Sequence, residues 1–335
     1  MALIIVEFFM NIFLTGFRGF VGGHLLRTLL NANESITDNR NLITVIGRNP
    51  SELLEGNVCF HKVSIDKNFD YSLLLKNQDV VIHCAARVHV MSDESIDPLE
   101  AYREVNTGGT VKLAQQAFQE GVKRFIFISS IKVNGESTSI GQPFSSNDIR
   151  SPKDFYGQSK SEAEEQLLQY AEETGLEVVI IRPTLIYGPG VKANFASLLN
   201  ITSKGLPLPF GCITDNKRSL VSVKNLVDLI VTCIEHPKAP NEVFLVSDDY
   251  DVSTASMLKH MSQALGKPNR FLPIPLWCFR LVGKITGKMD VVDRLTGSLQ
   301  VDITHTKDTL DWVPPQTLEK GFKETAEAFL LNKNK

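Results

Sequence analysis

The sequence predicts an α/β fold with a doubly wound parallel sheet and a smaller C-terminal lobe. Short apolar runs alternate with longer amphipathic segments, a glycine-rich turn follows the first clear run, and a Gly/Pro-rich stretch interrupts the alternation after residue 190. Such alternation is typical of βαβ units, whose helices cover both faces of a parallel sheet. The 335 residues, 43% of them hydrophobic, are enough to bury a large core.

Five apolar runs are expected to form the central strands, because each is short and bounded by polar or glycine positions. They span residues 11–16, 42–47, 80–86, 124–130 and 177–183. The helices between them are expected over residues 21–32, 99–121 and 159–175. Ligands bind at the carboxyl ends of such strands, so the residues that follow each strand are candidate site residues.

The turn TGFRGFVGG, residues 15–23, has the composition of a dinucleotide-binding loop. Gly16 permits a tight turn, Gly19 lets a pyrophosphate approach the backbone, and Gly22 lets the helix pack on the strand. The spacing is GxxGxxG, and the turn lies between a strand and a helix, as such a loop requires. We therefore expect a Rossmann-type sheet with a nicotinamide dinucleotide on it. The loop is completed by Phe17, Arg18, Phe20 and Val21.

Basic residues near this turn favour NADP(H) over NAD. An NAD site usually has an acid after the second strand, but Gly47 stands there and Arg48 follows it. Arg48 and Arg18 are expected to bind a 2′-phosphate through charge-assisted hydrogen bonds. NAD stays an open alternative, because Glu34 and Asp38 lie near the spacing at which an acid binds the adenosine ribose.

The segments YGQSK and RFIFISS carry candidate catalytic groups. Tyr156 and Lys160 lie four residues apart at the start of a predicted helix, so they share one face. The lysine charge is expected to lower the pKa of the phenol and make it a usable acid or base. Ser130, at the end of the fourth predicted strand, is expected to donate a hydrogen bond to a reacting oxygen.

Taken together, these motifs resemble the extended short-chain dehydrogenase/reductase family, in its NAD-dependent epimerase/dehydratase branch. The resemblance covers nearly the whole chain and rests on TGFRGFVG, HCAARVHV, VNTGGT, SSIKVNG, YGQSK, RPTLIYGPG and KRSLVSVKNLVDLI. AARVHVM and SSIKVNGE further resemble a UDP-glucose 4-epimerase-like group, which includes 4-reductases that make UDP-N-acetylquinovosamine. The resemblance implies a nucleotide-sugar substrate.

The resemblance also assigns roles residue by residue. Ser130, Tyr156 and Lys160 match the catalytic positions, and Tyr156 and Lys160 also contact the cofactor. The remaining cofactor-binding positions are Ser64, Ile65, Ala85, Ala86, Arg87, Asn106, Ser129 and Pro183. Ser64 is a departure, since the family places an Asp there. The substrate-binding positions are Lys132, Asn194, Arg218 and Arg294.

The alternation of short apolar and longer amphipathic segments ends after Gly190, and this change predicts where the domains divide. The dinucleotide domain is expected over residues 10–190, with 219–247 returning to it as a helix and a strand. The substrate-binding lobe is expected over 191–218 and 248–335. The apolar residues 1–9 lack the features of a signal peptide, so we expect the fold to begin at Met10.

Departures from the family narrow the reaction. Family dehydratases carry an Asp-Glu pair after the catalytic Ser/Thr, where this chain has Ile131 and Lys132, so 4,6-dehydration is disfavoured. The favoured reaction is NADP-dependent reduction of the C4 keto group of a UDP-4-keto-6-deoxy-N-acetylhexosamine, in the synthesis of bacterial surface-polysaccharide (O-antigen) precursors. The alternative is a UDP-glucose or UDP-N-acetylglucosamine 4-epimerase with tightly bound NAD. A non-catalytic dinucleotide sensor is a third, weaker alternative.

Composition excludes several other classes of partner. The net charge of −3 without basic runs argues against nucleic acid. Five scattered cysteines without CxxC spacing, and seven histidines without ligand spacing, predict no metal site and suit a reducing, cytoplasmic location. No membrane insertion is expected, and the amphipathic run 275–287 is interpreted as a lobe helix that buries Trp277 and Phe279. The resemblance implies a homodimer made by packing two helices from each subunit, namely the helix that contains LEAYREVNTGG (99–109) and the helix that contains Tyr156 and Lys160.

Overall fold

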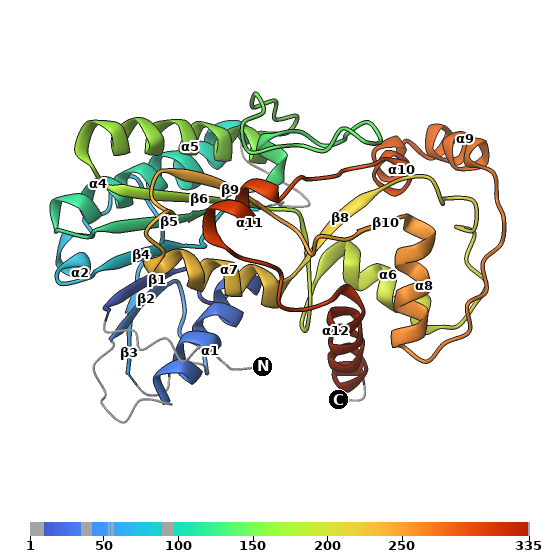
Figure 1. The fold of residues 1–335 in the computed structure, drawn as a ribbon, viewed down its shortest axis with the longest axis horizontal. Helices are drawn as coiled ribbons and strands as arrows, with labels where there is room; N and C mark the ends of the chain where they lie inside the picture. Colours follow the sequence, from blue (N-terminus) through green and yellow to red (C-terminus); the bar gives the residue numbers. More distant parts are fainter. Residues whose placement is uncertain (1–9, 35–41, 53, 55–56, 89–96, 334–335) are drawn as a thin grey trace.

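The computed structural model describes residues 10–34, 42–52, 54, 57–88 and 97–333, except for the side chains of 32–34 and 193–194. A seven-stranded parallel sheet in the order β3-β2-β1-β4-β5-β6-β9 forms its centre (Figure 1). The strands are β1 (Ile12–Thr15), β2 (Ile43–Gly47), β3 (Val58–Lys62), β4 (Val80–His83), β5 (Arg124–Ile128), β6 (Glu177–Pro183) and β9 (Glu242–Val246). The expected doubly wound α/β fold is confirmed.

Helices cover both faces of this sheet because its inner strands are apolar on both sides. Two helices pack on one face: α1 (Phe20–Glu34) and α7 (Val223–Glu235). The other face carries α2 (Ser72–Leu75), α4 (Thr110–Gln119) and α5 (Phe155–Thr174). Helix α3 (Pro98–Arg103) leads into α4 through η1 (Glu104–Gly109), one turn of π-helix.

A smaller lobe follows β6. Its sheet has the order β10-β8-β7, built from β7 (Leu185–Tyr187), β8 (Arg218–Ser222) and β10 (Asp251–Val252). Three helices close its core around Tyr187: α6 (Ala193–Ser203), α8 (Thr254–Ala264) and α12 (Leu318–Lys333). At the far end of the lobe lie α9 (Leu276–Thr286) and α10 (Met289–Thr296) (Figure 1).

One part of the C-terminal segment leaves the lobe and packs on the main sheet. Leu299, Val301, Ile303, Leu310 and Trp312 join the core that α1 and α7 cover, around α11 (Thr304–Leu310). The sequence assigned all of 248–335 to the lobe, whereas 299–312 spans both units. The proposed start of the fold at Met10 concerns residues 1–9, which lie outside the described residues; the first strand begins at Ile12.

Candidate active site

The serine and the tyrosine of the expected catalytic group meet where β5 and α5 come together. Ser130 follows β5 and is the N-cap of η2 (Ile131–Val133), accepting a 3.3 Å hydrogen bond from the Lys132 backbone N–H. Tyr156 is the second residue of α5, and the Ser130 side chain is near enough to its hydroxyl to lower the pKa of Tyr156. Helix α5 begins at this point because Asp154 caps it by accepting from the Gly157 N–H at 2.6 Å.

The glycine of YGQSK explains how closely the two elements approach. A Cβ atom on Gly157 would lie 2.9 Å from the Lys132 carbonyl oxygen, a distance that real Cβ atoms essentially never show. Only glycine therefore lets the first turn of α5 pack against η2. The side chain of Lys132 holds the same junction, because its ammonium group pairs with Asp154 and, at 3.0 Å, with Glu136. The expected substrate-binding lysine thus lies in an ion-pair cluster.

Lys160 lies one turn further along α5 and is buried, with 1% of its surface exposed. Its ammonium group donates to the Ile128 carbonyl at 2.9 Å and lies 4.3 Å from the centre of the Phe127 ring. Burial lowers the pKa of Lys160 to about 7, while the neighbouring Cys84 and Glu164 act in the opposite direction. This lysine is therefore poised to exchange its proton near neutral pH.

The pKa of Tyr156 differs from the sequence expectation. Burial raises it well above the ordinary value, the charge of Asp154 raises it further, and the hydrogen bond from Ser130 opposes them. The expected net lowering of the Tyr156 pKa is wrong for the protein chain on its own, because burial has the larger effect and the Lys160 ammonium group donates to the Ile128 carbonyl. The hydroxyl group is protonated at neutral pH and is ready to donate.

Asn106 links this group to the loop after β4. It is fully buried in the π-helical turn η1, accepts from the Arg87 N–H at 2.8 Å, and donates to the Arg87 carbonyl at 3.0 Å and to Ser159 Oγ at 3.0 Å. Ser159 Oγ in turn donates to the Tyr156 carbonyl at 2.8 Å. π-Helical turns are rare and occur mostly at functional sites. This one directs the Asn106 amide toward both Arg87, in the loop after β4, and Ser159, on α5.

His83, at the end of β4, joins the glycine turn to the same π-helical turn. Thr110 Oγ1 donates to the Asn106 carbonyl at 2.7 Å, so it must accept from His83 Nε2 at 2.9 Å. The other ring nitrogen, Nδ1, then accepts from the Thr15 hydroxyl at 2.7 Å. Burial lowers the pKa of His83 to about 3, with help from the Lys160 charge, so the ring stays neutral. It is the satisfied core histidine that its apolar strand predicts.

A buried ion pair lies directly behind Ser129 and was not predicted from the sequence. Glu164 is 0% exposed and Arg182 is 2% exposed; Arg182 Nη2 lies 2.5 Å from Glu164 Oε2, and its Nε lies 2.9 Å from Oε1. The Ser129 hydroxyl donates to Glu164 Oε1 at 2.5 Å. The pair therefore ties α5 and β6 to the residue that precedes Ser130. The sequence feature that could have indicated this ion pair is Arg182, a charged residue inside the apolar run EVVIIRP.

The glycine turn has the shape that a dinucleotide requires. Gly16 has a φ of +74°, and its Cβ would lie 2.6 Å from the backbone after β4. A Cβ on Gly22 would lie 2.3 Å from the Gly16 carbonyl oxygen, whereas one on Gly19 would meet only that oxygen, at 3.0 Å. The turn is thus pressed against β4 and α1 but open at Gly19, next to the N-terminus of α1, which suits an anionic pyrophosphate.

The two arginines expected to select NADP(H) are both exposed, in the turns after β1 and β2. Gly47 precedes Arg48, and a Cβ there would lie 2.8 Å from the Phe17 ring, so the ring fills the place of an acidic side chain. Asp38 lies outside the described residues.

The remaining expected cofactor residues lie at the same edge of the sheet. Phe20 and Val21 begin α1, Ala85 and Ala86 follow β4, and Pro183 ends β6. The Ala85 N–H donates to Thr15 Oγ1 at 3.1 Å, which joins this loop to the glycine turn.

Ser64 and Ile65 follow β3 at the same edge. Ser64 is exposed, while Ile65 packs closely against the π-helical turn, 2.5 Å from where a Gly109 Cβ would lie.

Two arginines of the lobe lie side by side. Arg218 begins β8 and donates to the carbonyl oxygens of Arg294 at 2.8 Å and Gly297 at 3.2 Å. Burial lowers its pKa, and the charge of Arg294 lowers it further. Arg294 is 49% exposed at its side chain and pairs only with Asp290, among described residues. Two adjacent cations gain most when a dianion binds between them. The side chain of Asn194 lies outside the description.

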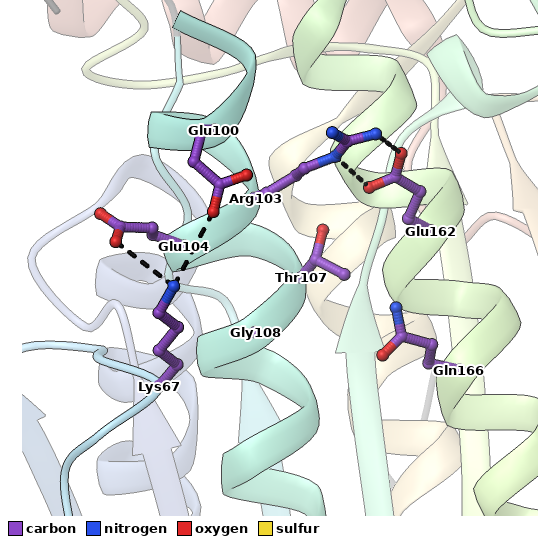
Figure 2. A pocket seen from close by; sticks show the side chains of 8 residues that line it. All are labelled: Lys67, Glu100, Arg103, Glu104, Thr107, Gly108, Glu162 and Gln166. Carbon is purple, nitrogen blue, oxygen red and sulfur yellow. Dashed lines mark hydrogen bonds and ion pairs between the residues drawn. The ribbon is translucent and has the colours of Figure 1, made fainter. Parts of the chain in front are cut away.

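A surface pocket lies elsewhere, between α5 and the helices α3 and η1 (Figure 2). Lys67 lies between Glu100 and Glu104, and Arg103 makes a two-pronged contact with Glu162. None of the expected catalytic side chains lines it, so it is separate from the candidate site. No helix in the described ranges is both long and apolar enough to cross a bilayer, and none of their His, Cys and acidic side chains form a metal-ligand cluster.

Comparison with known proteins places the chain in a family. The profile of the NAD dependent epimerase/dehydratase family matches residues 12–247. A protein of Vibrio cholerae called UDP-glucose 4-epimerase is 58% identical over 325 residues, 97% of each chain. The chain belongs to the NAD-dependent epimerase/dehydratase family.

More distant relatives and solved structures are also similar. An Escherichia coli O157:H7 protein, N-acetyl-alpha-D-glucosaminyl-diphospho-ditrans,octacis-undecaprenol 4-epimerase, is 29% identical and covers 95% of this chain and 94% of its own. The Thermotoga maritima UDP-glucose 4-epimerase, solved with UDP-glucose, has a TM-score of 0.74 at 24% identity and covers 97% of this chain and 100% of its own. A Bacillus cereus UDP-glucuronic acid 4-epimerase, solved with NAD, has the same TM-score at 22% identity, covering 96% and 99%. These structural matches support the fold.

Proposed function

We propose that the protein is a UDP-hexose 4-epimerase that interconverts UDP-glucose and UDP-galactose, or their N-acetyl forms, with NAD as cofactor. The observation that carries this proposal is the 58% identity, over 97% of both chains, to the Vibrio cholerae UDP-glucose 4-epimerase. The NADP-dependent 4-reductase that the sequence favoured needs the same three side chains. Its main support was the pair Arg18 and Arg48, and no relative described above is a reductase.

The glycine turn would hold the dinucleotide, and Lys160 and Asn106 would lie on its nicotinamide side. When bound, NAD would supply the reversible hydride chemistry at the sugar C4. The protein supplies the proton chemistry: Tyr156 Oη holds the proton of the C4 oxygen, and Ser130 Oγ shares a hydrogen bond with the same oxygen. Because burial keeps Tyr156 protonated, its conversion to a base would depend on a positive charge, which Lys160, one turn further along α5, would supply.

The lobe would hold the nucleotide part of the substrate while the sugar turns to present its other face to the cofactor. A 4-epimerase must present both faces of a keto sugar to one hydride donor, so the sugar must turn without the nucleotide leaving. Arg218 and Arg294 are suited to this task, because two adjacent guanidinium groups would bind a diphosphate through charge-assisted hydrogen bonds without contacting C4. Binding of this kind acts equally on both epimers, which a reversible reaction requires.

The experiment offers UDP-glucose to purified protein without added cofactor, follows the sugar C4 proton by NMR, and identifies any nucleotide released on denaturation. We expect UDP-galactose to form, NAD to be released, and Tyr156→Phe to lose activity by about 10²–10⁴-fold. Consumption of NADPH with UDP-4-keto-6-deoxy-N-acetylglucosamine, without interconversion of UDP-hexoses, would overturn the proposal in favour of the reductase.

We also propose a homodimer through α4 and α5. These helices lie side by side on one face of the sheet (Figure 1). Phe118 of α4 is 37% exposed and packs edge-on against Tyr170 of α5, with ring centroids 6.0 Å apart, so two aromatic side chains bridge the helices at the surface. Light scattering after gel filtration tests it: Phe118→Glu should shift a dimer of the 37.3 kDa chain to monomer. A monomeric wild-type protein would contradict it.

A further inference from the structure

The helices α9 and α10 carry an unusual density of exposed apolar side chains. The described part of the chain exposes 21 large hydrophobic residues, and seven of these lie between residues 272 and 291. The most exposed in this segment are Ile285 at 76%, Trp277 at 65% and Val282 at 58%. The sequence expectation that Trp277 is buried is therefore wrong. Phe279 does pack inward, stacking on Phe210 with ring centroids 5.8 Å apart.

The two faces of α9 explain why Trp277 is exposed while Phe279 packs inward. Gly283 lies on the inner face, where a Cβ would come within 2.8 Å of Val292 and 2.9 Å of Met289, so α10 packs directly on the α9 backbone. Trp277, Leu281 and Ile285 recur every four residues and form the outer face. The inner face of α9 packs against α10, and the side chains of the outer face are left exposed. We call Trp277, Leu281, Val282 and Ile285 the α9 outer face.

Charge around this face is basic, although the protein as a whole is acidic. Residues 267–294 contain six Lys or Arg residues and two Asp residues, against a net charge of −3 for the whole chain. Arg280 and Lys284 follow the same four-residue spacing along the edge of the α9 outer face, and Lys288 follows the helix. Within the described ranges no carboxylate pairs with any of these three cations.

We propose that the α9 outer face docks on the surface of an anionic phospholipid bilayer. An interfacial helix places aromatic and aliphatic side chains among the acyl chains while its Lys and Arg residues reach the headgroups. Tryptophan prefers this boundary because its ring is apolar and its N–H is polar. Helix α9 also lies near one end of the long axis of the molecule, so it reaches a flat surface without obstruction by the main sheet (Figure 1).

A protein partner fits these observations less well. An anionic bilayer supplies a continuous negative surface for the flanking cations, whereas a second copy of this chain has a net charge of only −3. The docking is peripheral, since α9 has 11 residues, too few to span a bilayer. It would hold the enzyme at the membrane without changing the residues that carry out its chemistry.

Tryptophan fluorescence tests the proposal directly, because the chain has two tryptophans. Trp312 is 5% exposed and its indole donates to Asp228 at 2.7 Å, so it is shielded from lipid. We expect vesicles of phosphatidylglycerol to shift the emission to the blue and brominated phosphatidylglycerol to quench it. Both changes should disappear in Trp277→Phe, in 0.5 M salt and with pure phosphatidylcholine vesicles.

Vesicle co-sedimentation of substituted proteins separates the face from the rest of the surface. Leu281→Glu/Ile285→Glu should reduce binding at least tenfold and leave turnover of UDP-glucose unchanged. Leu73→Glu is the matched control, because Leu73 is 89% exposed on α2, remote from α9, and should bind like wild type. Wild-type protein that does not bind phosphatidylglycerol overturns the proposal. So does self-association that the double variant abolishes, without any binding to vesicles.

Discussion

The two sides of the candidate site are built in opposite ways. On the sheet side, Lys160, Asn106 and Glu164 are almost fully buried, and each is held by at least one hydrogen bond or ion pair of 3.0 Å or less. On the lobe side, Arg294 is 49% exposed and pairs with a carboxylate one turn away. The sheet side is thus fixed before any ligand binds, and the lobe side adapts. Substitutions should accordingly affect stability on the first side and substrate affinity on the second.

The sharpest test compares two glutamates on α5 that lie two residues apart. Glu164 accepts three hydrogen bonds from Arg182, and Glu162 accepts two from Arg103. Glu164 and Arg182 are buried, whereas Glu162 and Arg103 are 26% and 39% exposed. Removing one charge of a buried pair strands the other, so Glu164→Gln should lower the free energy of unfolding by about 3–5 kcal/mol. Glu162→Gln should cost about 1 kcal/mol or less. Urea titration measures both.

A second variant guards against failure of Glu164→Gln to fold. Glu164→Met/Arg182→Met removes both charges and should recover most of the lost stability, because no buried charge is left unpaired. If Glu162→Gln and Glu164→Gln lowered the free energy of unfolding equally, the inference that the buried ion pair holds the sheet side of the site rigid would be wrong.

Lys160 makes the stability of the fold depend on pH, and its lowered pKa sets the direction of that dependence. Its pKa is about 7 in the folded protein and 10.5 in the unfolded chain, so between these values the unfolded state binds the extra proton and stability rises with pH. The cost of burying the charge is full below pH 7. Lys160→Met should therefore stabilise the fold by roughly 2–4 kcal/mol at pH 6, with the gain shrinking toward pH 10, while activity is lost. A gain that does not change between pH 6 and pH 9.5 in urea titrations would refute this account.

Asn106 tests whether the π-helical turn positions the catalytic helix. Asn106→Ala removes three hydrogen bonds of a buried amide and should cost about 2 kcal/mol of stability. Because the β4 loop and Tyr156 lose their common anchor, kcat should fall about tenfold or more, with KM for UDP-glucose nearly unchanged. Thr107→Val is the control, since it removes one bond to the Ser159 carbonyl and leaves the β4 loop in place. Equal kinetic effects in the two variants would argue for a merely structural asparagine.

The sequence predicted the features that depend on local pattern. The five central strands are continuous apolar runs, and the positions of Ser130, Tyr156 and Lys160 follow from one strand end and one helix start. The edge strand β3 was missed, since its residues are mostly half-buried and carry no continuous apolar signal.

The remaining features arise only after packing. Glu164 and Arg182 find each other when α5 covers β6, and burial reverses the direction expected for the pKa of Tyr156. The exposure of Trp277 likewise depends on how α9 sits on α10. Sequence patterns show which residues are apolar or charged, but not which contacts tertiary packing will satisfy.

The smallest expected effect belongs to the lobe. Arg294→Ala removes one of two adjacent cations, and its loss should raise KM for UDP-glucose about tenfold with kcat within twofold, because a diphosphate contact acts equally in the ground and transition states. Stability should change by less than about 0.5 kcal/mol, since the side chain is half-exposed. Arg280→Ala, an exposed arginine on α9, is the matched control and should leave KM unaltered. If both substitutions leave KM unaltered, Arg294 does not grip the nucleotide, and the adaptable side of the site must lie elsewhere in the lobe.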